Sequence, residues 1–125
     1  GQPRIVEGDL KTIMAGLACG EPNILGWDIL RNHTTAFVSC PDWVTARGMR
    51  TLGAPEKGDP RVISGESGAV TTGLVETLML DPEYAELKEL IGLDKTSSVL
   101  CFSTEGDTDP DQYRRIVWEG EYPTC

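Results

Sequence analysis

Apolar residues occur along this chain in two patterns, one at helical spacing and one as short continuous runs. Helical spacing, with apolar side chains every three or four residues, marks three segments, 41–53, 68–80 and 82–92. Two further helices are predicted near the N-terminus. One runs from Asp9 or Thr12 to Ala18, and the other is capped by Asn23 and continues through Leu30.

The short apolar runs predict strands at 35–39, 62–63 and 97–102. Strands that alternate with helices indicate an α/β fold, so we expect one unit over residues 1–125, a three-layer arrangement of a partly parallel sheet with flanking helices. Three strands make a thin sheet, and the two leading helices have no strand before them. The pattern therefore predicts part of a larger domain.

The last predicted strand ends abruptly in a polar loop, Ser103–Asp109. In open α/β sheets, ligands bind beyond the carboxyl ends of the strands, so this loop is a candidate site. The alternative is a plain turn into a helix, in which Asp109 caps a helix that Pro110 begins. The residue types alone leave both interpretations open.

A second polar turn, Ser64–Gly68, precedes the long helix. Its glycines and the free amides of a helix N-terminus are compatible with a phosphate site. Against this, the Glu66 carboxylate repels phosphate, and no lysine follows as in a Walker loop. The alternatives are a capped helix packed closely on a strand, and a role for Glu66 beside a cationic or hydrogen-bonding ring.

Charge and hydropathy exclude several classes of partner. The net charge is −9, and the 11 basic residues are scattered, which disfavours nucleic acid and anionic membranes. No apolar run approaches the ~20 residues of a membrane span, and the first residues lack the pattern of a signal peptide. We therefore expect a cytoplasmic protein.

The cysteines give little support for metal or thiol chemistry. Cys19, Cys40, Cys101 and Cys125 form no Cys-x-x-Cys pair, and His33 is the single histidine, so no zinc or other metal site is predicted. A reducing compartment favours free thiols. Cys101 is expected in the core and Cys125 at the surface. A cysteine nucleophile would need His33 as its base, but His33 is expected at the polar end of a helix.

Several motifs, in order from about residue 5 to residue 122, together resemble the C-terminal third of the diaminopropionate ammonia-lyases. This family belongs to the fold-type II pyridoxal phosphate enzymes, which share the tryptophan synthase β-like fold. The resemblance rests on Thr12–Pro22, Ser39–Asp42, Gly58-Asp59, Ser64–Val70, Phe102–Asp109 and Val117–Pro123.

The resemblance implies a lyase of amino-acid catabolism that uses pyridoxal 5'-phosphate. The expected reaction is α,β-elimination of 2,3-diaminopropionate to pyruvate and ammonia, with the cofactor as electron sink. By analogy with the family, Ser103 is the hydroxyl that meets the pyridine nitrogen, and Thr104 is the alternative. Glu66 matches a carboxylate found near the ring. A homodimer is expected.

Other functional parts of the family have no counterpart in this chain. In the family that this chain resembles, the Schiff-base lysine, the glycine-rich phosphate loop and the catalytic aspartates lie upstream of the matching segment. The residues around Lys11, Lys57, Lys88 and Lys95 do not match those around the family's Schiff-base lysine. No catalytic residue is therefore predicted here. The chain is expected to be inactive alone and to need the upstream part of the enzyme as its partner.

Three interpretations remain open. The chain is either such a lyase fragment or a non-catalytic α/β module that binds a small anion or a partner through Ser64–Gly68. Another pyridoxal phosphate enzyme, such as a threonine or serine dehydratase, is the third option, which the 12–22 segment disfavours. An upstream reading frame that encodes the lysine and the glycine loop would distinguish the first option from the second.

Overall fold

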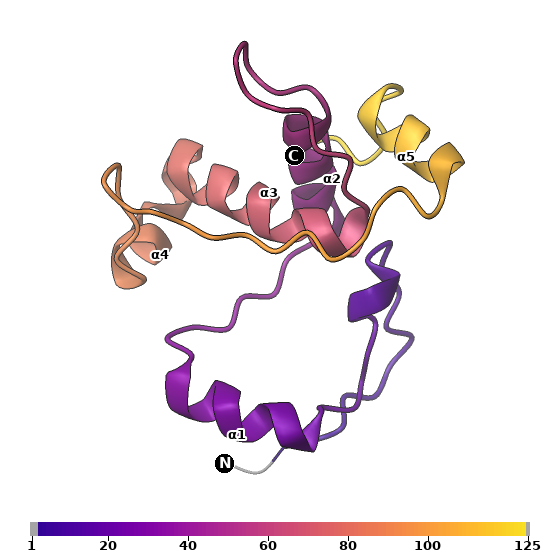
Figure 1. Ribbon diagram of the computed structural model, residues 1–125. Coiled ribbons are helices and arrows are strands. Elements are labelled where there is room, and N and C mark those ends of the chain that lie inside the picture. The colour runs from indigo at the N-terminus through magenta and orange to yellow at the C-terminus, as the bar shows by residue number, and fades with distance from the viewer. Residues whose placement is uncertain (1–2, 125) are drawn as a thin grey trace.

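The computed structural model describes residues 3–124, and every regular element in that range is a helix. Figure 1 shows α2 and α3 packed across each other at the centre, with the remaining elements around them. The elements are η1 (Ala15–Leu17), α1 (Ile24–His33), α2 (Asp42–Gly53), α3 (Glu66–Leu80), η2 (Pro82–Tyr84), α4 (Ala85–Leu90) and α5 (Pro110–Val117).

The predicted helix boundaries are confirmed where a capping residue defines them. The side chain of Asn23 accepts from the amides of Leu25 and Gly26, over 2.9 and 3.0 Å, and so caps α1. Asp109 caps α5 in the same way, one residue before Pro110. The helix predicted from Asp9 or Thr12 to Ala18 is wrong in extent, because only the 3-10 turn η1 forms there.

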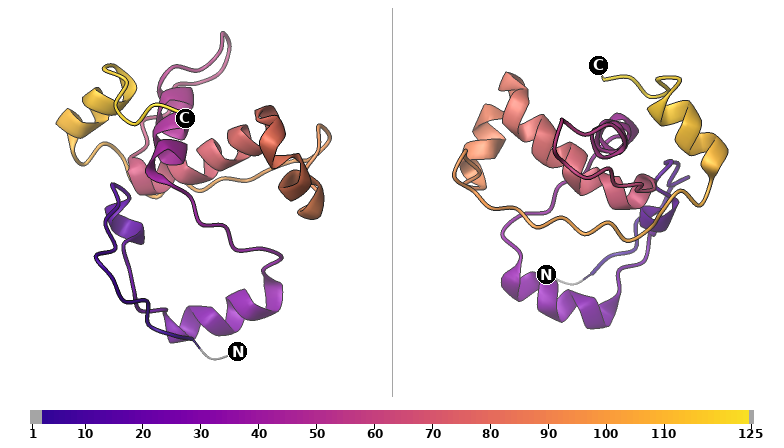
Figure 2. Two further views of the ribbon diagram at one scale, coloured as in Figure 1. Left: turned by 180° about the vertical axis from the view of Figure 1, so that it is seen from behind. Right: turned by 45° about the horizontal axis from the view of Figure 1, so that its top comes forward.

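The predicted sheet is wrong for the part of the chain that the structure covers. Segments 35–39, 62–63 and 97–102 form no strand, and Phe37, Leu100 and Phe102 are exposed. A strand requires a neighbour that pairs with its backbone groups. The 97–102 segment instead runs alongside α3 toward the beginning of that helix (Figures 1 and 2). The apolar runs are therefore present without partners.

The core lies where α2, α3 and α5 meet. Its buried members are Ala46 and Met49 of α2, Ala69 of α3, and Tyr113 and Ile116 of α5. Sequence spacing predicted a stripe of Val70, Leu74 and Leu78 on α3, but only Leu78 is buried. The buried face of α3 instead includes three small residues spaced by four, Ala69, Gly73 and Thr77. Small side chains on this face let the backbone of α2 approach closely.

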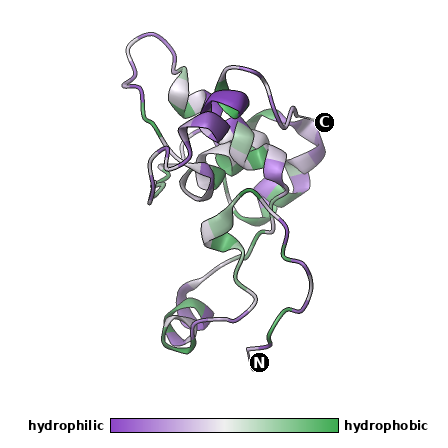
Figure 3. Cartoon of the chain, turned by 90° about the vertical axis from the view of Figure 1, so that its right-hand side faces the viewer, coloured by the Kyte–Doolittle hydropathy of each residue, from purple (hydrophilic) through white to green (hydrophobic). Residues whose placement is uncertain are grey.

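Two other predicted apolar faces are not covered. Figures 2 and 3 show α1 set apart from the central helices, and its Leu25 is 84% exposed. The stripe predicted on 84–91 does not enter the core, since Leu90 is 80% exposed and no residue of α4 is buried. Within 3–124, no helix has both the length and the hydrophobicity to cross a membrane.

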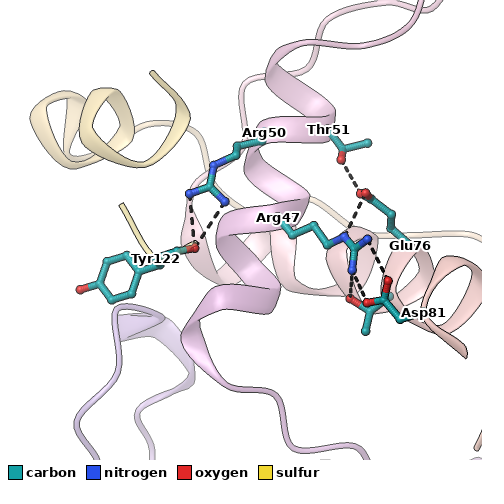
Figure 4. Close-up of polar contacts among 7 residues, drawn as sticks. Arg47, Arg50, Thr51, Glu76, Asp81 and Tyr122 are labelled. Carbon is teal, nitrogen blue, oxygen red and sulfur yellow. Dashed lines mark hydrogen bonds and ion pairs between the residues drawn. The ribbon is translucent and has the colours of Figure 1, made fainter. Parts of the chain in front are cut away.

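Two arginines of α2 tie the elements together (Figure 4). Arg47 binds Glu76 over 3.0 Å and Asp81 over 2.5 Å, and the hydrogen bond to Asp81 is the main cause that raises the pKa of Arg47. Arg50 donates to the carbonyl oxygens of Ile116, over 3.0 Å, and of Tyr122. Burial lowers the pKa of Arg50. These bonds anchor α3 and the C-terminal segment to α2.

Candidate functional site

The beginning of α3 is the point where most of the motifs singled out in the sequence converge. The amide of Gly16, in η1, donates to Ser67 Oγ over 3.1 Å. The Thr45 hydroxyl of α2 donates to the backbone carbonyl of Glu66. Asp42, at the start of α2, accepts from the Thr12 hydroxyl over 2.5 Å. Segments far apart in sequence therefore meet around one helix terminus.

The amides at the start of α3 are bound by a carboxylate from another segment. Gly65 is the N-cap residue and has no side chain, but the Ser67 amide donates to Glu105 Oε1 over 2.5 Å. The Gly65 amide donates to the backbone carbonyl of Glu105 over 3.1 Å. Because a negative charge already lies at this terminus, the structure favours the capped-helix interpretation over the phosphate site. The helix packs on a loop here, not on the expected strand.

Two hydroxyl groups form the second feature of this site. Ser103 Oγ donates to Ser64 Oγ over 2.8 Å, and Ser64 is completely buried whereas Ser103 is exposed. Gly68 makes room for the pair, since a Cβ atom there would lie 2.7 Å from Ser64 Oγ and 3.1 Å from Ser103 Oγ. The site thus contains an exposed serine whose neutral hydroxyl is bound to a second, buried hydroxyl.

All three predicted cofactor-binding residues lie near this helix end, but they differ in environment. Thr104 is exposed, and its amide nitrogen would be 3.1 Å from a Cβ atom on Gly68. Glu66 is buried at 8% exposure, and its Oε1 accepts from the Gln112 side chain over 3.0 Å. Glu66 therefore links α3 to α5.

Sequence reasoning missed the functional context of Ser64, Glu105 and Gln112. Each of them contacts its partner across 38 to 46 residues of sequence. Helical and strand periodicity reach only a few residues, so no local pattern indicates these pairs. The one usable signal was composition, because Ser64 and Glu105 both lie in the polar turns that the sequence singled out.

The remaining candidates from the sequence are the cysteines, the single histidine and a metal site. Cys101 is only partly buried, so its core assignment is wrong, while burial raises the pKa of the Cys40 thiol. His33 is the last residue of α1 and is exposed, as predicted. Cys125 lies outside the described residues. Residues 3–124 contain no group of three or more His, Cys, Asp or Glu side chains that would hold a metal ion.

None of the four lysines has the environment of a covalent cofactor site. Lys11, Lys57 and Lys95 are exposed, and Lys88 of α4 is partly buried. A lysine that forms a Schiff base is activated in a desolvated pocket or beside another cation. That the Schiff-base lysine lies upstream of this chain stays a prediction.

The helical arrangement is similar to part of a solved structure that contains a pyridoxal phosphate intermediate. A crystal structure from Escherichia coli, in complex with an aminoacrylate-PLP azomethine reaction intermediate, matches with a TM-score of 0.84 and 58% identity. The match covers 89% of this chain and 29% of the other. That protein is diaminopropionate ammonia-lyase, and its apo form matches with a TM-score of 0.76, 53% identity and coverage of 81% and 28%.

Sequence comparison gives the same result. Diaminopropionate ammonia-lyase of Escherichia coli K12 is 57% identical over 117 residues, which are 94% of this chain and 29% of the relative. The Salmonella typhimurium enzyme is 53% identical over 121 residues, 96% of this chain and 30% of the relative. No family model matches the chain. The resemblance based on the motifs is thus confirmed, and the chain spans less than a third of these relatives.

Proposed function

We propose that this chain is the C-terminal part of a cytoplasmic diaminopropionate ammonia-lyase of fold-type II, and that the whole enzyme is a homodimer. The reaction of that enzyme would be the elimination of ammonia from 2,3-diaminopropionate, with pyruvate and ammonia as products. The observation that carries the proposal is the identity of 57% over 117 residues, together with a structural match at a TM-score of 0.84 over 89% of this chain.

The hydroxyl pair fits the ring side of pyridoxal phosphate. When bound, the cofactor would act as an electron sink for bond cleavage at the substrate. Ser103 would contact the pyridine nitrogen, since it is an exposed residue whose hydroxyl is held from behind by Ser64. A neutral hydroxyl leaves this nitrogen less protonated than a carboxylate partner would. Thr104 is the alternative contact, and Glu66 would line the same wall.

The phosphate end of the cofactor would be held by another part of the enzyme. Glu105 occupies the amides at the start of α3, and its charge would repel a phosphate there. The four lysines are partly or fully exposed, which supports the proposal that the lysine linked to the cofactor also belongs to another part of the enzyme. This chain would therefore supply one wall of the site, and the upstream polypeptide would supply the lysine, the phosphate loop and the catalytic aspartates.

The exposed apolar runs support a missing neighbour as well. Leu100 is 78% exposed and Phe102 is 71% exposed, in a segment that leads directly to Ser103. Pairing of this run with upstream strands would bury it and would fix the direction in which Ser103 points. The predicted sheet would then belong to the complete enzyme, in which strands from both parts pair.

A chimera tests the proposal. The matched segment of the Escherichia coli relative is replaced by this chain, and the chimera is assayed for bound pyridoxal phosphate by absorbance and for release of pyruvate from diaminopropionate. We expect both in the chimera and neither in the 125-residue chain alone. A folded chimera that binds no cofactor would overturn the proposal. Cofactor or anion binding by the isolated chain would instead favour the binding module.

A further inference from the structure

A buried hydroxyl lies directly behind the hydroxyl that the proposed function assigns to the cofactor. Ser103 Oγ donates to Ser64 Oγ over 2.8 Å, and Ser64 Oγ donates to the carbonyl oxygen of Gly65 over 3.2 Å. Ser64 has 0% exposure, so bulk water does not compete for its hydroxyl. The two bonds form a chain that runs from an exposed group into the interior.

We infer that Ser64 is a positioning residue, which holds the Ser103 hydroxyl and lets it offer either a lone pair or a proton to the ring nitrogen of pyridoxal phosphate. The inference rests on the proposed function, because that function places Ser103 against the ring. It adds a role for Ser64, which neither the motifs nor the relatives assign.

The protons and lone pairs of the two hydroxyls support this role. Each hydroxyl has one proton and two lone pairs. When the Ser103 proton points inward to Ser64, the outer side of Oγ presents a lone pair, which suits a protonated ring nitrogen. A neutral ring nitrogen needs a donor. Ser103 can then turn its proton outward, because Ser64 can turn its own proton from the Gly65 carbonyl to Ser103 Oγ.

The second inward contact of Ser103 cannot replace Ser64. That contact is the backbone carbonyl of Glu105, at 3.4 Å from Ser103 Oγ. A carbonyl oxygen accepts hydrogen bonds and never donates one. With Ser64 changed to alanine, Ser103 would keep only this long contact and would lose the inward donor that a proton-donating Ser103 needs.

The backbone around the pair is fixed, so the two oxygens stay within reach. The loop bearing Ser103 is bound to α3 through the amides of Gly65 and Ser67, which donate to Glu105 over 3.1 and 2.5 Å. Gly68 leaves the space that the two hydroxyls occupy. The hydroxyl protons are consequently the groups that are free to rearrange when a ligand binds.

The test uses the chimera described above with Ser64→Ala, Ser103→Ala and the double variant, and the readout is the dissociation constant of pyridoxal phosphate. We expect Ser64→Ala to weaken binding by roughly 2- to 10-fold, the range of one hydrogen bond. It should also move the absorption maximum of the bound cofactor, which responds to hydrogen bonding at the ring nitrogen. Thr71→Ala, which removes the hydroxyl of an exposed residue of α3, is the matched control.

The double variant separates positioning from structure. If Ser64 acts through Ser103, the double variant binds as weakly as Ser103→Ala alone, because the hydroxyl to be positioned is gone. Equal losses from Ser64→Ala with and without Ser103, or a loss no larger than that of Thr71→Ala, would overturn the inference. If Ser64→Ala does not fold, Ser64→Cys, which keeps a group of similar size with weak hydrogen bonding, enters the same cycle. A parent chimera that binds no cofactor counts against the proposed function itself.

Discussion

Gly48 and Gly73 face each other where α2 crosses α3. A Cβ atom on Gly48 would lie 2.7 Å from the Gly73 nitrogen, and one on Gly73 would lie 2.9 Å from the Gly48 nitrogen. Each would also collide with a backbone carbonyl, of Ala69 and Val44 respectively. The two backbones therefore touch directly, and this contact sets the position of α3, whose first turn carries the candidate site.

Alanine at either glycine should destabilise the chain. We expect Gly73→Ala to lower the free energy of unfolding by about 1–3 kcal/mol, the usual cost of overpacking. This loss should appear although alanine is favoured over glycine by about 1 kcal/mol inside a helix. Denaturant titration measures it. Gly106→Ala, where a Cβ atom would meet open space, should change stability by less than about 0.5 kcal/mol. Equal effects of the two variants would contradict the steric explanation.

Removal of the side chain that caps α5 should lower stability by the worth of one hydrogen bond. Asp109 Oδ1 accepts from the Gln112 amide over 3.0 Å. Asp109→Ala should therefore lower the free energy of unfolding by about 0.5–2 kcal/mol. Asp109→Asn should keep most of the stability of the parent chain, because asparagine is an equally good cap. Gln112 also binds Glu66, so the alanine variant should loosen the contact between α5 and α3. A loss of the same size in the asparagine variant would show that charge, not capping, matters.

Tyr113 offers a stabilising substitution. Its ring is in the core, and among residues 3–124 its hydroxyl has no hydrogen-bond partner. A buried polar group without a partner is costly, so Tyr113→Phe should raise the free energy of unfolding by about 1 kcal/mol. Tyr113→Leu, which also removes the ring, should lower it by about 0.5–3 kcal/mol. Thermal and denaturant unfolding of the three forms decide this, and a less stable phenylalanine variant would mean that the hydroxyl is satisfied.

The Cys40 thiol should respond to pH according to its burial. Burial raises its pKa in the folded state above the unfolded value of about 8.5. The thiolate is the reactive form, so alkylation of Cys40, followed by peptide mass spectrometry, should rise at higher pH in the folded chain than in urea. Because the folded state favours the neutral thiol, the contribution of Cys40 to the free energy of unfolding is complete below the pKa of the unfolded chain. It is lost as the pH rises through the pKa of the folded chain. Cys40→Ser should reduce this loss, and an alkylation profile that folding leaves unchanged would contradict the assignment.

The uncovered apolar runs should cause the isolated chain to associate. Leu100 and Phe102 are more than 70% exposed in one short segment, at 78% and 71%. Light scattering of the 125-residue chain should show dimers or larger species, because burial of this segment between copies removes apolar surface from water. A Leu100→Ser and Phe102→Ser double variant should shift the population toward monomer. A parent chain that is monomeric at high concentration would show that these apolar segments stay exposed to solvent without causing association.

Much of the local structure could be predicted from neighbouring residues in the sequence. Asn23 and Asp109 specify two helix starts through bonds to amides two or three residues ahead, and the turn at Asp81-Pro82 ends α3 by the same short-range chemistry. The polar turns at 64–68 and 103–109 also indicated the position of the candidate site, whose role stays a prediction. These features depend on contacts within a single turn of chain, so a single sequence contains them.

What only the tertiary structure decided depends on partners far along the chain. The buried face of α3 includes Ala69, Gly73 and Thr77 because α2 lies against it, whereas of the residues that the apolar spacing indicated only Leu78 is buried. The runs at 35–39, 62–63 and 97–102 had the composition of strands, but a strand forms only when another pairs with it. The contact of Ser103 with Ser64 spans 39 residues, and folding alone brings those two hydroxyls together.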